Sequence, residues 1–177
     1  MTIALKHPDD GMTLVELIIV VLVSGVFLTL IALIFGSSLG AQQRATERDA
    51  ITAQLNAATA HVTETVRSSS DIKVNATGTR VDARFLKADG VTWECRAWAV
   101  VTKQLRYSAG ASARSADTTT WKLLASGMKG TLGGGTAFAQ SGKRLSLGLE
   151  QTQGQTTVAV SNGAVAQIVM TGGPACW

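Results

Sequence analysis

The chain has 177 residues, 46% of them hydrophobic and 16% charged, with a formal net charge of +4. This length fits one domain of ordinary size. Its two cysteines form no C-x-x-C pair, and with only two histidines no zinc-ligand spacing is present. The sequence therefore predicts no metal site and no cofactor.

The first eleven residues form a short polar segment. Pro8 and the Asp9-Asp10-Gly11 sequence disfavour a helix and favour an exposed, extended peptide. Lys6 and the starting amine carry most of its positive charge, which indicates a cytoplasmic N-terminus by the positive-inside rule. Arg44 and Arg48, beyond the apolar run that follows, weaken this signal.

Residues 14–35 are an apolar run of 22 residues with one charge, Glu16. As a helix the run is roughly 33 Å long, enough to span a hydrocarbon core of about 30 Å. The sequence predicts one membrane helix with a single domain on one side. A cleaved secretory signal is the alternative, because small residues follow at 36–41, although such signals have a shorter apolar region. A buried core helix is disfavoured, since nothing else in the chain is apolar enough to surround it.

Residues 36–70 have the pattern of an amphipathic helix. Apolar residues recur at steps of four, three, four and four and fall on one face: Ile51, Leu55, Ala58, Val62 and Val66. We expect Gly36 and Gly40 to loosen the junction with the apolar run. We expect the helix to end at the Ser-Ser-Ser-Asp sequence of residues 68–71.

The rest of the chain has β-like patterns. Residues 81–87 and 91–101 predict a hairpin with an Asp89-Gly90 turn, and residues 105–109 the next strand. Residues 143–151 and 156–162 predict a second hairpin. The expected fold class is α+β: a long N-terminal helix, membrane-spanning in its first half and amphipathic in its second, packed on an antiparallel sheet. The expected divisions are a leader at 1–11, a membrane or filament-core helix at 12–35, an amphipathic half at 36–70 and a β-rich domain at 71–177.

Cys95 and Cys176 either form one disulfide or remain two buried thiols. A disulfide would hold the last residues of the chain, where fraying is otherwise expected. By loop entropy it would stabilise the domain by up to roughly 4 kcal/mol. The four tryptophans are expected to anchor the core or a sheet face: Trp93, Trp98, Trp121 and Trp177.

The start of the apolar run resembles the prepilin signature of type IV pilins and type II secretion pseudopilins. The residues that carry the resemblance are Gly11, Met12, Thr13, Leu14, Val15 and Glu16. Met12 stands where Phe is commoner in that family, and Asp9 and Asp10 stand where basic residues are usual. The resemblance implies that a membrane aspartyl peptidase cuts between Gly11 and Met12 on the cytoplasmic side, and that the Met12 amine is then methylated.

Glu16 is the residue whose position most needs an explanation. A carboxylate in a membrane helix costs up to about 3 kcal/mol at mid-bilayer and less near the edge. After cleavage it would be the fifth residue, and in a staggered helix bundle it could meet the Met12 amine of a neighbouring subunit. Such a pair sets register more than it adds stability. The alternative is a Glu16 in the headgroup region without a role.

The resemblance implies a structural subunit, a minor or J-type tip component, of a type IV pilus or a related secretion or competence pseudopilus. Its expected partners are the prepilin peptidase, other pilin subunits, the inner-membrane assembly platform and the cytoplasmic membrane. The expected location is a single pass through that membrane with the globular domain outside.

Other functions remain open alternatives. A DNA-uptake pilin would contact DNA through basic residues such as Lys143 and Arg144, which otherwise form a solvated surface. A simple membrane-anchored extracellular domain is another alternative.

An enzyme is not expected: His61, the only histidine after cleavage, flanks the apolar stripe and is interpreted as a surface-edge residue. The glycines of residues 130–138 lack the spacing and the lysine of a phosphate-binding loop.

Overall fold

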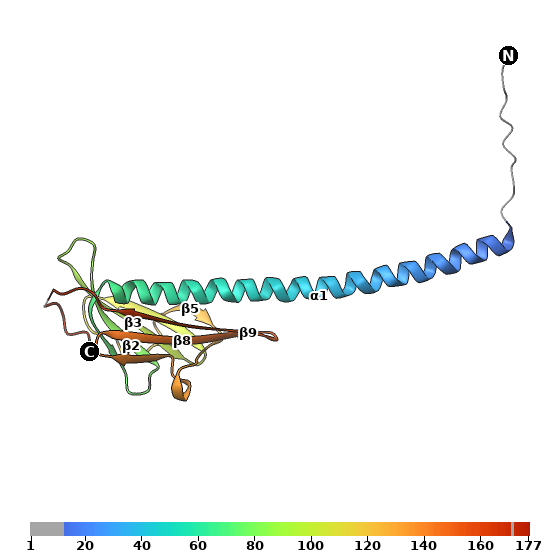
Figure 1. The fold of residues 1–177 in the computed structure, drawn as a ribbon. Coiled ribbons are helices and arrows are strands. Elements are labelled where there is room, and N and C mark those ends of the chain that lie inside the picture. Colours follow the sequence, from blue (N-terminus) through green and yellow to red (C-terminus); the bar gives the residue numbers. More distant parts are fainter. Residues whose placement is uncertain (1–12, 171) are drawn as a thin grey trace, which may run out of the picture. The chain divides into compact units, whose positions relative to one another are not determined.

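The computed structural model describes residues 13–170 and 172–177. Gly11 and Met12, the predicted cleavage pair, lie outside the described residues. The chain divides into two compact units, Met1–Arg44 and Ala45–Trp177, which are described separately. Helix α1, Leu14–Arg67, contributes residues to both units (Figure 1).

In the first unit, α1 is an isolated helix with an apolar surface on every side. Its large apolar side chains from Leu14 to Leu39 are 42–75% exposed. The helix continues without a break through Gly36 and Gly40, where the sequence predicted a looser junction. Its N-terminus is capped by Thr13, whose Oγ1 accepts a hydrogen bond of 3.3 Å from the backbone N–H of Glu16.

In the second unit, α1 packs one face against the strands (Figure 1). The predicted apolar stripe is confirmed: Ile51, Leu55, Ala58, Val62 and Val66 are all at most 5% exposed. The helix ends at Arg67, as the Ser-rich sequence indicated, and the first strand begins at Ser69. Ser69 sits at this junction, and its hydroxyl donates a hydrogen bond of 2.6 Å to the Thr65 carbonyl oxygen.

Five strands form an antiparallel sheet in chain order: β1 (Ser69–Val74), β2 (Arg80–Leu86), β3 (Trp93–Val101), β4 (Gln104–Gly110) and β5 (Lys122–Ser126). The predicted first hairpin is β2 and β3. Its turn is held by Asp89, whose carboxylate accepts hydrogen bonds from the backbone N–H groups of Val91 and Thr92. Gly90 has a φ of 70°, which a residue with a side chain rarely adopts.

A second antiparallel sheet contains β6 (Met128–Gly130), β7 (Phe138–Ser141), β8 (Arg144–Gln153) and β9 (Thr156–Val165), with the short helix η1 (Gly133–Gly135) between β6 and β7. The predicted second hairpin is β8 and β9. The sequence predicted an antiparallel sheet without its division into two. The chain leaves β5 at Gly127, where a φ of 74° redirects it, and β6 then pairs with β8.

The core lies where the α1 stripe meets both sheets. Trp98 and Leu105 come from the first sheet, and Phe138, Leu145 and Leu147 from the second, all at most 1% exposed. Side chains alternate between the faces of a strand, so the neighbours of Trp98 point to the other face of β3. There Ala97 and Ala99 form a second cluster with Trp121. This outer face of the first sheet is therefore also covered.

Candidate functional site

The first candidate is the apolar part of α1. An 18-residue window of the helix has a mean hydropathy of 3.1 and no buried residue, so the helix is long and apolar enough to span a membrane. Two of its hydroxyl side chains bond to carbonyl oxygens of the same helix. The Thr29 hydroxyl donates to the Gly25 carbonyl oxygen at 2.8 Å, and the Ser37 hydroxyl to that of Ile34 at 2.9 Å. The segment therefore suits an apolar environment that has no water to offer.

Glu16 is the third residue of this helix, three positions after the capping residue Thr13. Thr-x-x-Glu is the spacing of a capping box, and a carboxylate in the first turn is favoured by the helix dipole. The spacing thus makes Glu16 a candidate for a local helical role, which the sequence interpretation missed although the motif was visible; the cap bond itself uses its backbone N–H. Among the described residues no ion-pair partner faces its carboxylate.

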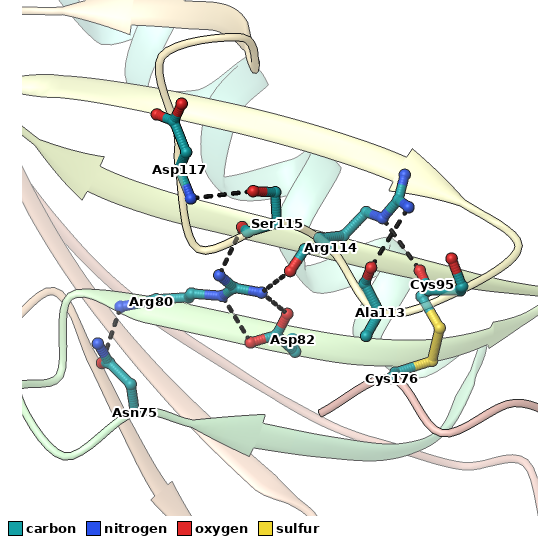
Figure 2. A network of polar contacts seen from close by, with 10 residues as sticks. Asn75, Arg80, Asp82, Cys95, Ala113, Arg114, Ser115, Asp117 and Cys176 are labelled. Atoms are coloured by element: carbon teal, nitrogen blue, oxygen red, sulfur yellow. Dashed lines mark hydrogen bonds and ion pairs between the residues drawn. A yellow bond between two sulfur atoms is a disulfide. The ribbon is translucent and has the colours of Figure 1, made fainter.

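The two cysteines form a disulfide within the second unit, the first of the two alternatives that the sequence left open. Cys95 on β3 is joined to Cys176, and each is 1% exposed (Figure 2). The bond attaches the C-terminal residues to the outer face of the first sheet. Arg84 on β2 adds to this attachment, because its Nε–H donates a hydrogen bond of 3.0 Å to the Pro174 carbonyl oxygen.

An arginine network holds the connection between β4 and β5 on the same face. Figure 2 shows the Arg80 guanidinium group between Asp82 and the backbone of this connection. Arg80 donates two hydrogen bonds of 2.7 and 2.8 Å to the Asp82 carboxylate, and others to the carbonyl oxygens of Arg114 and Ser115. Its guanidinium carbon lies 4.9 Å from the centre of the Trp121 ring. The available sequence signal was Arg80 directly before the predicted strand at 81–87, two residues from Asp82 within it.

His61 is more deeply placed than the sequence indicated. It is half-buried, and its Nδ1 accepts a hydrogen bond of 3.0 Å from Trp98 Nε1–H, with Tyr107 edge-on at 4.7 Å. Burial, and then the positive charges of Arg96 and Lys122, lower the pKa of His61. His61 thus keeps the partial exposure of a surface-edge residue, but Trp98 of β3 and Tyr107 of β4 contact its ring, which the sequence did not indicate.

Other expected features lie apart from these groups. Lys143 and Arg144 are exposed at the turn between β7 and β8 and have no ion pair in the described part of the chain. Trp98 and Trp121 are core anchors, as expected, whereas Trp177 is 41% exposed. Across residues 13–170 and 172–177, no group of three or more His, Cys, Asp or Glu side chains could hold a metal ion.

No protein-family model, no curated protein and no solved structure matches the chain.

Proposed function

We propose that this protein is a structural subunit of a type IV pilus or a related pseudopilus, of the minor or tip kind. It is cut between Gly11 and Met12, methylated on Met12 and assembled through its N-terminal helix. The observation that carries the proposal is the apolar surface of α1, exposed on all sides from Leu14 to Leu39 and continuous with a folded domain.

Such a surface must be shielded from water. Apolar side chains left in water would each forfeit roughly 1.5–3 kcal/mol of burial energy. A lipid bilayer supplies the cover before assembly, and the equivalent helices of other subunits supply it afterwards. Because the capped start of the helix places Glu16 in its first turn, the carboxylate lies at one end of the apolar surface. This is where a charge can set the axial position of neighbouring helices at the least cost.

The proposal gives the two units different tasks. The apolar helix is the anchor and the assembly element, with the cytoplasmic membrane, the prepilin peptidase and the assembly platform as partners. The domain, Ala45–Trp177, faces the outside and carries any surface-specific role. Within it, the cystine and the arginine network stabilise the two segments that cover the outer face of the first sheet.

The test is the N-terminus of the protein purified from membranes with and without a co-expressed prepilin peptidase. Intact mass and N-terminal sequencing should show a start at methylated Met12 only when the peptidase is present, and Gly11→Val should abolish the cut. Gly36→Val is the matched control and should leave processing unchanged. A Met1 start in every sample would reduce the protein to a single-pass anchored domain. A start beyond Gly36 would make it a secreted protein.

A further inference from the structure

A cleft of about 420 Å³ opens on the outer face of the first sheet. Its lining residues come from β1 and the turn after it, from β2, from the β4–β5 connection and from the C-terminus: Lys73, Asn75, Arg80, Asp82, Ala116 and Trp177. The volume is within the range of small-molecule sites, roughly 300–1,000 Å³. The role proposed for the N-terminal helix makes no use of this cleft.

Both walls of the cleft are fixed without a ligand. The wall that contains Ala116 is held by Arg80, which donates to the carbonyl oxygens of Arg114 and Ser115 at 3.0 and 2.9 Å (Figure 2). The wall that contains Trp177 is held by the Cys95–Cys176 disulfide next to it. A site whose walls are already ordered loses little conformational entropy when it binds.

The cleft joins an aromatic surface to an unpaired positive charge. Trp177 is 41% exposed, and the Arg84 guanidinium carbon lies 5.2 Å from its ring centre. Lys73 is exposed and has no ion pair among the described residues. The Asp82 charge is offset by Arg80 at 2.7 Å. The side chains around the cleft thus offer the part of the indole ring that Arg84 leaves exposed, and a free ammonium group.

We infer that this cleft binds an acidic saccharide. A sugar ring presents C–H groups on its faces, which pack against an indole ring, and hydroxyl groups at its edge. A carboxylate on the sugar, or an anionic ester group, would pair with the Lys73 ammonium group. Single-stranded nucleic acid also stacks on aromatic rings, but it needs a groove with several cations along its backbone. Lys73 is the only cation lining the described cleft that is not already paired.

Asn75 and Arg80 shape the cleft rather than supply free ligand groups. The Asn75 amide is used by its own turn, where it accepts from Thr79 N–H and donates to the Thr77 hydroxyl, both at 2.9 Å. Arg80 is engaged by Asp82 and by the connection. Trp177 and Lys73 are therefore the two residues whose removal should affect binding most directly.

The test uses the full chain in detergent micelles and isothermal titration calorimetry. The probes are a galacturonate hexamer, maltohexaose as the uncharged control, and a thymidine hexanucleotide. We expect saturable binding of the galacturonate hexamer and about a tenfold or greater loss of affinity in Trp177→Ala and in Lys73→Gln. Lys103→Gln, an exposed lysine in the turn between β3 and β4 that does not line the cleft, should change affinity by less than about twofold.

Because Trp177 adjoins Cys176, intact mass must show that the disulfide is still formed in Trp177→Ala, and Trp177→Phe should recover part of the affinity. Three results would overturn the inference. One is no saturable binding of the galacturonate hexamer. Another is equal binding of maltohexaose. The third is tighter binding of the hexanucleotide that depends on the same two residues.

Discussion

Trp98 Nε1–H donates a hydrogen bond of 3.0 Å to His61 Nδ1, and this bond joins β3 to helix α1. An indole N–H can only donate, so Nδ1 must be unprotonated. The neutral His61 ring therefore carries its proton on Nε2. A second proton would break the bond to Trp98 and place a cation close to Arg96 and Lys122, whose charges already disfavour it.

The stability of the domain should fall as the pH is lowered past the ordinary titration range of histidine. The His61 pKa is below its usual value of 6.5 in the folded state, mainly because the ring is buried and Arg96 is near, with only Glu64 opposing. The unfolded chain then binds more protons below about pH 6.5. The stabilisation is therefore complete above pH 6.5 and is lost as the pH falls toward the folded-state pKa.

Thermal unfolding followed by circular dichroism between pH 7.5 and 5.5 would measure this dependence. His61→Phe is the matched variant, because it keeps an aromatic ring beside Trp98 and Tyr107 and removes the titration. We expect the wild-type midpoint to drop with pH more steeply than that of the variant. Parallel profiles would show that His61 does not carry the effect.

The parts of the fold that were predictable are those with a local period. The α1 stripe and the β2–β3 and β8–β9 hairpins each depend on residues close in sequence, and their apolar spacing or turn residues indicate them directly. The His61–Trp98 bond joins residues 37 positions apart, and Arg80 reaches Ser115 across 35. Which strand side chains cover a helix residue depends on sheet order, and one sequence does not specify that order.

The Cys95–Cys176 disulfide should contribute strongly to the stability of the second unit. It links residues 81 positions apart, and both side chains are buried. Replacing both with alanine should lower the free energy of unfolding by about 2–5 kcal/mol. Urea unfolding monitored by tryptophan fluorescence would measure the loss. A wild-type sample with dithiothreitol should behave like the double variant, and a reduced protein as stable as the oxidised one would contradict the prediction.

Asn75 should stabilise the turn between β1 and β2 through both of its amide atoms. Its Oδ1 accepts from the N–H groups of Thr79 and Arg80 at 2.9 and 3.0 Å, while its Nδ2 donates to threonine hydroxyls. We expect Asn75→Ala to cost about 1 kcal/mol or somewhat more, and Asn75→Asp to cost less because it keeps the acceptor. Urea unfolding of the two variants would show the order. Equal losses would mean that the acceptor bonds contribute little.

Glu16 has two candidate roles, and one pair of variants separates them. As part of a capping box it stabilises the first turn of α1, a role that glutamine also performs. As the partner of a neighbouring Met12 amine it needs its negative charge. Glu16→Gln should therefore leave helix formation intact and reduce filament assembly by about tenfold or more, which is the effect of losing about 1.4 kcal/mol per contact. Thr13→Ala removes the capping hydroxyl, which lies 3.3 Å from the Glu16 N–H. This variant should lower helix formation and leave filament assembly unchanged.

The measurement combines circular dichroism of the processed protein in micelles with the amount of sedimentable assembly after detergent removal. Normal assembly by Glu16→Gln would assign Glu16 to capping alone and remove the register pair from the proposal. Failure of both variants to assemble, with helix content lost only in Thr13→Ala, would mean that assembly needs both the charge and an ordered first turn. The charge requirement would then hold independently of helix stability, because glutamine preserves the cap and changes only the ability to pair with an amine.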